Sequence, residues 1–148
     1  GDERRHPARG RAEWAPAVIA LDTNVLARIL VEDDREQTRR ATALLRRAVA
    51  QGEALFVSDV VVCELAWVLS SAYGFSWQIV AGTLRDLLDV DELSFRDHGA
   101  LERALTSFEA GTADFSDFVI RELARSAGCE TVATFDKALQ KLPGFAAV

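Results

Sequence analysis

The sequence predicts an α/β fold in which helices surround a small parallel β-sheet. Short apolar segments at 17–21, 55–57, 92–94 and 131–134 alternate with longer segments of helical pattern. Strands that alternate with helices favour a parallel sheet with right-handed crossover connections. The first segment has no polar face, as expected of a strand that is buried on both sides.

Six helices are expected between and after these strands, most of them marked by a capping residue. Ser58 or Asp59 caps one of them, Ser76 caps the next, and Gly128 closes the last. The expected helices span residues 23–30, 36–50, 59–72, 77–88, 98–108 and 115–127, and a short helix follows at 137–142. The crossovers hold two helices each, so the fold is not a simple βα repeat.

Composition indicates one globular domain. The chain has 148 residues, of which 49% are apolar and 27% are charged, and these values argue against disorder. No apolar run is long enough to span a membrane. The net charge of −6 is unusual for a nucleic-acid binder, which normally has a basic surface. An acidic chain that acts on nucleic acid needs a bound divalent cation or a similar device to accept phosphate.

The first 16 residues differ from the rest of the chain. Residues 1–16 are rich in arginine, hold two prolines and lack periodicity, so we expect a disordered extension before a domain at 17–148. A basic arm that touches RNA is the alternative. No signal-peptide core follows. The two cysteines, Cys63 and Cys129, form no metal-binding pair and are expected to be small buried residues of a cytoplasmic protein.

Acidic residues recur where strands end and helices begin. Asp22 follows the first strand and Asp136 follows the strand at 131–134, while Glu64 is the only charge between residues 60 and 69. Asp114 and Asp117 stand three positions apart at a helix start. Each acid has a structural alternative, because Asp22, Asp114 and Asp136 could be helix caps and Glu64 could lie on an exposed polar stripe. Ligands of open parallel sheets collect at the carboxyl ends of the strands, so we expect the acids to meet there.

Together these carboxylates predict a metal centre. Unpaired, they would repel one another, and hard, oxygen-seeking Mg²⁺ or Mn²⁺ relieves such repulsion best. The expected chemistry is metal-assisted hydrolysis of a phosphodiester, in which the metal neutralises the phosphate and lowers the pKa of a bound water. Neither histidine is needed as a base. Phosphate-binding glycine loops, dinucleotide fingerprints and nucleophile elbows are absent from the sequence.

These motifs resemble the PIN-domain family, and within it the VapC-like toxins of bacterial toxin–antitoxin pairs. The matching stretches are LDTNVLARIL (21–30), VSDVVVCELAWVLSSAYG (57–74), ADFSDFVIRELARSAGC (113–129) and VATFDKAL (132–139). They occur in the family's order and frame nearly all of 17–148. The resemblance implies a three-layer α/β/α sandwich around a small parallel sheet and a Mg²⁺-dependent endoribonuclease.

The resemblance also assigns residues and partners. It implies that Asp22, Glu64, Asp117 and Asp136 are the catalytic acids, that Asp114 is an auxiliary metal ligand, and that Asn24 and Thr134 support the site. It implies an RNA substrate, a homodimer, and a partner antitoxin that places a basic side chain among the acids.

Three other interpretations remain open. A receiver-like phospho-acceptor module also gathers aspartates and Mg²⁺ at strand ends, but it prefers regular βα alternation. A degenerate PIN domain could act as a non-catalytic scaffold, although all four acids are present. A PIN-type nuclease could also process RNA without an antitoxin.

Overall fold

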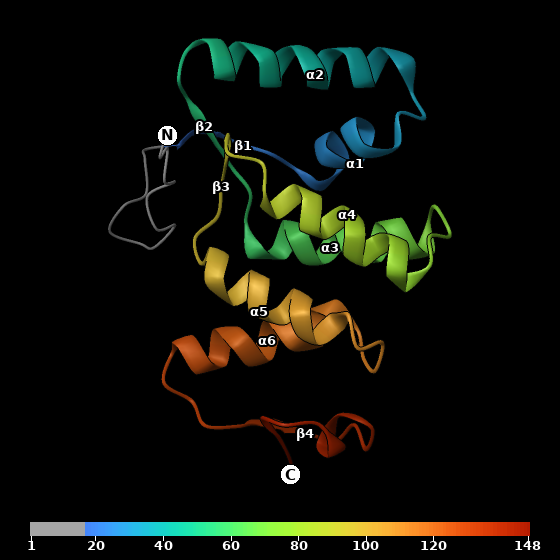
Figure 1. Ribbon diagram of the computed structural model, residues 1–148, viewed down its shortest axis with the longest axis vertical. Coiled ribbons are helices and arrows are strands. Elements are labelled where there is room, and N and C mark those ends of the chain that lie inside the picture. The colour runs from blue at the N-terminus through green and yellow to red at the C-terminus, as the bar shows by residue number, and fades with distance from the viewer. Residues whose placement is uncertain (1–16) are drawn as a thin grey trace, which may run out of the picture.

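The computed structural model describes residues 17–148, so the expected N-terminal extension lies outside the described residues. The described chain is long, with its first three strands near one end and its last two at the other (Figure 1). None of the helices between residues 17 and 148 combines the length and hydropathy needed to cross a bilayer.

All the expected strands and the six longer helices form, with small shifts of their ends. The elements are β1 (Ala17–Ala20), α1 (Thr23–Val31), α2 (Arg35–Ala50), β2 (Ala54–Phe56), α3 (Asp59–Ser71), α4 (Trp77–Leu88), β3 (Leu93–Ser94), α5 (His98–Phe108), α6 (Phe115–Ser126), β4 (Val132–Thr134), the 3₁₀ turn η1 (Leu139–Lys141) and β5 (Phe145–Ala147). The expected short helix at 137–142 is reduced to η1, and β5 was not expected.

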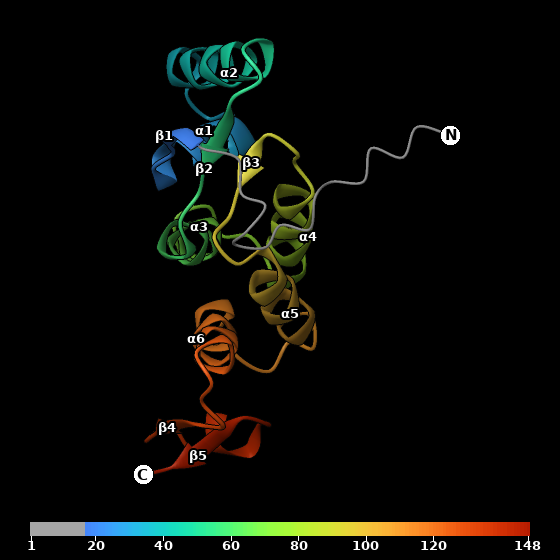
Figure 2. The same cartoon turned by 90° about the vertical axis from the view of Figure 1, so that its left-hand side faces the viewer.

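The strands form two parallel sheets where one was expected. One sheet has the order β1-β2-β3, and the other pairs β4 with β5. The two sheets lie at opposite ends of the described chain, as two perpendicular views show (Figures 1 and 2). The α/β class with small parallel sheets is therefore confirmed, but the strand edge that β1 and β4 were expected to share is not formed.

Capping residues set the starts of α3, which carries Glu64, and of α4. Ser58 accepts a hydrogen bond from the backbone N–H of Val61 (3.2 Å), and Ser76 accepts one from Ile79 (3.3 Å). Each cap satisfies a backbone donor that the first helical turn leaves unpaired. The core that these helices enclose is formed by buried aliphatic and aromatic residues, among them Leu55, Val57, Val62, Leu65, Leu69, Leu84, Phe95, Leu101, Leu105 and Phe118.

A buried arginine, Arg121, connects the β4–β5 sheet to α6. The Arg121 side chain is 7% exposed and forms an ion pair with Glu122 at 3.1 Å. It donates hydrogen bonds to the carbonyl of Pro143 (3.1 Å) and to Ser107 Oγ (2.6 Å). Its guanidinium carbon lies 5.9 Å from the centre of the Phe145 ring in β5. Through these contacts the β4–β5 sheet packs against α6.

Candidate functional site

The first group of acids, here called the Asp22 group, comprises Asp22 and Glu64 and is held together by Thr23. Asp22 is the N-cap of α1, and its Oδ1 accepts a hydrogen bond from the backbone N–H of Thr23 at 2.7 Å. The Thr23 side chain is buried, and its Oγ1 donates to Glu64 Oε2 at 2.6 Å. Thr23 therefore links the carboxylate after β1 to the carboxylate on α3. The sequence signal for this link was only a threonine directly after the aspartate.

Both carboxylates of the Asp22 group are exposed. Glu64 is therefore exposed, as the alternative interpretation expected, but the stripe of α3 on which it lies is not polar. Val60 and Trp67, on neighbouring turns of α3, are also exposed, at 67% and 68%. An apolar stretch of sequence thus faces solvent on this side of the helix. Exposure leaves the Glu64 carboxylate free to accept a further ligand without the cost of burying a charge.

The second group of acids, the Asp117 group, comprises Asp114, Asp117 and Asp136. Asp114 occupies the N-cap position of α6 but makes no capping hydrogen bond with its side chain. Partial burial raises the pKa of Asp117, and the negative charges of Asp114 and then Asp136 raise it further, while a backbone hydrogen bond at Asp114 lowers it. The effect of Asp136 on this pKa shows that acids from α6 and from the end of β4 share one electrostatic environment.

Asp136 is both a cap and a member of this group. Its Oδ1 accepts hydrogen bonds from the backbone N–H groups of Ala138 (2.8 Å) and Leu139 (3.2 Å), so it caps the turn after β4. Its own backbone N–H donates to Thr134 Oγ1 at 3.0 Å. Thr134 therefore supports the loop that carries Asp136, and its role in the site stays a prediction.

The structure does not bring the two groups of acids together. Among residues 17–148, no three histidine, cysteine, aspartate or glutamate side chains lie close enough to hold a metal ion. The expectation that four elements carry their acids to one edge of one sheet is wrong for this arrangement, because β4 pairs with β5 and not with β1. The donors within one chain, as arranged here, therefore do not fit a divalent ion shared by all four acids.

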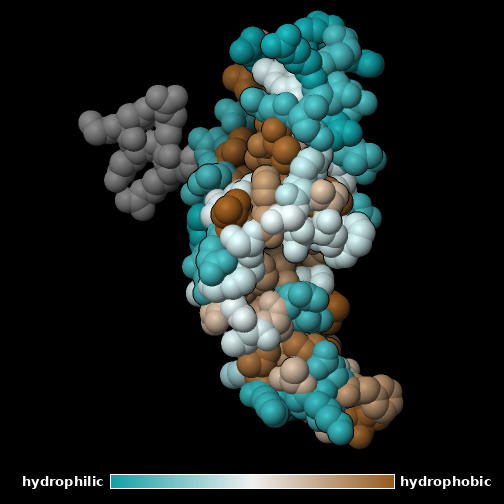
Figure 3. All heavy atoms as spheres, turned by 90° about the vertical axis from the view of Figure 1, so that its right-hand side faces the viewer, coloured by the Kyte–Doolittle hydropathy of each residue, from teal (hydrophilic) through white to brown (hydrophobic). Residues whose placement is uncertain are grey.

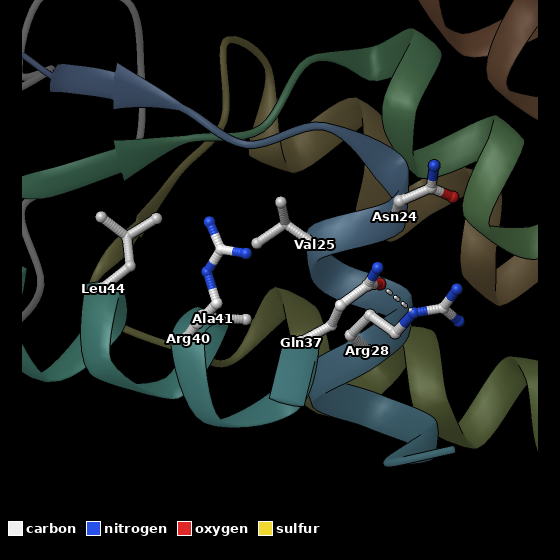
Figure 4. Close-up of a pocket in the computed structure, with 7 residues that line it drawn as sticks. All are labelled: Asn24, Val25, Arg28, Gln37, Arg40, Ala41 and Leu44. Atoms are coloured by element: carbon white, nitrogen blue, oxygen red, sulfur yellow. Dashed lines mark hydrogen bonds between the residues drawn. The ribbon is translucent and has the colours of Figure 1, made fainter. Parts of the chain in front are cut away.

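A pocket of about 340 Å³ lies between α1 and α2, and its lining includes Asn24, two residues after Asp22 (Figure 4). Asn24 lies at its edge, and Arg40 extends from α2 toward Val25. Arg28 also lines it, but its side chain is tied to Asp33 (3.0 Å), Gln37 (2.6 Å) and Tyr73 (2.8 Å). Arg40 is exposed and contributes the second positive charge of this pocket.

A second pocket, of about 320 Å³, extends from α3 to the start of α6. Its walls include Trp67 and Trp77, which are 68% and 42% exposed, and Asp114 of the Asp117 group. Trp67 does not lie in the core of the described chain. Cys63 lines the same pocket, while Cys129 is exposed, so the expectation that both thiols are buried is wrong.

Comparison with known proteins identifies the family. A search of the curated proteins found none that matches this chain. The family model described as the PIN domain matches residues 19–144, a stretch that contains both groups of acids. PIN domains are typically nucleases that use divalent metals and act on RNA or DNA. The match covers most of the chain, and the protein therefore belongs to the PIN-domain family.

Proposed function

We propose that the protein is a Mg²⁺-dependent endoribonuclease and the toxin of a VapC-like toxin–antitoxin pair. The observation that carries the proposal is the position of the acids within the PIN match: Asp22 after β1, Glu64 on α3, Asp117 on α6 and Asp136 after β4. A nuclease that acts on nucleic acid follows from the family. The ribonuclease activity, the metal and the toxin role are the steps that we add.

The charge of the site supports a cationic cofactor. Both groups present carboxylates to solvent, and a phosphodiester that approached them alone would meet only like charge. Mg²⁺, or Mn²⁺ in its place, offsets that repulsion and prefers carboxylate oxygens. Asp22, Glu64, Asp117 and Asp136 are the catalytic acids of the proposal, and Asp114 is an auxiliary ligand. Thr23, Asn24 and Thr134 are positioning residues.

The surfaces around the acids suit a single-stranded substrate. Arg40 lines the pocket between α1 and α2, and the pocket with Trp67 and Trp77 offers aromatic faces beside Asp114. Phosphates bind cations, and unpaired bases stack on exposed aromatic side chains. Both features favour RNA whose bases are accessible.

Cleavage of labelled RNA tests the enzymatic part of the proposal. Single-stranded RNA and DNA of one sequence would be incubated with the purified protein in Mg²⁺, in Mn²⁺ and in EDTA. We expect internal cleavage of the RNA with either metal and none in EDTA. Asp22→Asn and Asp117→Asn should each lower the rate by about 100-fold or more, the loss typical of a removed electrostatic contact in a transition state. Asp86→Asn, at an exposed position on α4, is the control and should cleave normally. Full activity of Asp22→Asn, or cleavage of DNA alone, would overturn this proposal.

Growth experiments test the toxin role. Expression of the wild-type chain should arrest growth of a bacterial host, whereas Asp22→Asn should not. Co-expression of the protein encoded next to this gene should restore growth, because an antitoxin with a basic side chain can neutralise the acids. Cleavage of RNA without growth arrest would favour a processing nuclease that has no antitoxin.

A further inference from the structure

Strand β1 has one edge that no described strand occupies. It pairs with β2 on one side and is the outer strand of its sheet. Its residue Ala20 is exposed, and the chain leaves the strand at Asp22. An open strand edge presents backbone N–H and C=O groups that readily pair with another strand.

Strand β4 has the complementary feature at the other end of the molecule. It pairs only with β5 among the described strands, and the chain leaves it at Asp136. The apolar side chains next to this sheet are unusually open, since Phe135 is 83% exposed and Val148 is 76% exposed. Figure 3 shows apolar surface at this end of the molecule, whereas the end formed by α2 is hydrophilic. Exposed aromatic and aliphatic residues beside an open strand mark a surface that is covered in an assembly.

The two edges fit each other. Both sheets are parallel, so β4 placed alongside β1 in the same direction gives one five-stranded sheet in the order β5-β4-β1-β2-β3. Adjacent strands lie about 4.8 Å apart, and parallel strands end at the same edge. Asp22 and Asp136, each two positions beyond the last residue of its strand, would then stand next to each other.

The chain's own β4 is held away from its own β1. Arg121 binds the β4–β5 sheet to α6 through the carbonyl of Pro143 and the ring of Phe145. The two open strands lie at opposite ends of the long molecule (Figure 2). A second copy can supply β4 without breaking the Arg121 contacts. Two copies lying side by side in opposite directions can make both junctions at once, which gives a closed two-fold dimer.

We propose that two copies of this chain pair β1 of each with β4 of the other, and that the junction joins the Asp22 group of one copy to the Asp117 group of its partner. The two groups of acids are then separated only within a monomer. In the dimer, each complete site takes its Asp22 group from one chain and its Asp117 group from the other. The catalytic consequence rests on the proposed nuclease function, but the strand pairing itself does not.

Mixing of inactive variants tests the shared site. Asp22→Asn and Asp117→Asn chains would be combined, exchanged through mild denaturation, and assayed for RNA cleavage. In a mixed dimer one junction carries both substitutions and the other carries none. Half of the randomly formed dimers are mixed, so activity should return to about a quarter of the wild-type rate. Asp22→Asn mixed with Glu64→Gln is the matched control and should stay inactive, because both substitutions lie in the same group. A mixture of Asp22→Asn and Asp117→Asn that stays inactive would overturn the proposal.

Cross-linking tests the pairing without any activity. Ala20→Cys and Ala133→Cys chains, both with Cys63→Ser and Cys129→Ser, would be mixed and treated with a short thiol cross-linker. We expect a covalent dimer that contains one chain of each kind and a particle of twice the chain mass by light scattering. Val49→Cys on α2, also exposed, replaces Ala20→Cys in the control and should not link. A monomer at micromolar concentrations, or a dimer that links equally through Val49→Cys, would contradict the strand pairing even if RNA is cleaved. A chain that dimerises and cross-links but cleaves no RNA would instead contradict the nuclease function alone.

Discussion

Replacement of Glu122 tests the contacts that fix the C-terminal sheet. The Glu122 side chain is 2% exposed, and Arg121, Arg103 and Arg125 surround it, with the closest pairs at 3.1, 3.2 and 3.0 Å. Glu122→Leu keeps the volume apolar but removes the only negative charge of this cluster. Arg103 and Arg125 are 56% and 45% exposed and remain solvated. Arg121, at 7% exposed, would be left as a buried cation without its carboxylate.

The loss of one partner from a buried ion pair costs about 3–5 kcal/mol. Arg121 keeps its hydrogen bonds to Pro143 and Ser107, so we expect Glu122→Leu to fall near the lower end of that range. For a chain of this size the melting temperature should drop by roughly 10 °C. Urea unfolding followed by circular dichroism at pH 7 measures the change, as a lower midpoint with an unchanged slope.

The double variant Arg121→Met/Glu122→Leu provides the internal check. Because it removes both charges together, it should recover at least half of the stability that Glu122→Leu loses. Glu36→Leu removes an exposed pair with Arg39 and should leave the midpoint unchanged. An unfolding midpoint for Glu122→Leu equal to that of the wild type, or strictly additive effects in the double variant, would refute the reasoning.

Three further predictions concern thiols, glycines and metal. Burial, and then the charge of Asp59, raise the pKa of Cys63 to about 11, so only about a thousandth of this thiol is ionised at pH 8. Iodoacetamide should therefore label the exposed Cys129 first. Equal labelling rates of the two cysteines, measured by mass spectrometry, would contradict this prediction. Gly144→Ala should destabilise the chain more than Gly52→Ala. Both glycines have positive φ (+87° and +67°), a strain of about 1–2 kcal/mol for alanine, but only at Gly144 would the new Cβ lie 2.6 Å from Arg121 Cδ. Equal urea midpoints of the two variants would refute the difference. Mn²⁺ should raise the melting temperature of the protein, because a bound cation relieves repulsion among the acids, and EDTA should cancel the rise. An unchanged melting temperature at millimolar Mn²⁺ would count against a bound metal.

Local features of the fold were predictable because they depend on neighbours in sequence. Ser58 and Ser76 cap α3 and α4 as expected, and every expected strand forms. Capping needs only a side-chain oxygen and an amide two or three residues on. The strand β5 was missed because three residues after Pro143-Gly144 give too short a pattern.

Long-range features of the site could not be read from the sequence. The place of β4 in the fold depends on contacts between distant segments, such as those of Arg121 with Pro143 and Phe145. The exposure of Glu64 was likewise hidden, because an apolar stretch suggests burial unless one knows that Val60 and Trp67 also face solvent. The candidate acids stood out locally: Asp22 and Asp136 follow strands and Asp117 lies at a helix start. Glu64 stood out as the only charge in an apolar stretch.

Binding of Mn²⁺ tests most directly whether the two groups of acids act as one metal centre. Bound Mn²⁺ would be counted by electron paramagnetic resonance on the wild-type protein, on Asp22→Asn and on Asp117→Asn at equal concentrations. If each centre draws ligands from both groups, the wild type binds Mn²⁺ and either substitution removes most of the bound ion. An Asp22→Asn protein that binds as much Mn²⁺ as the wild type, with the same affinity, would contradict the account.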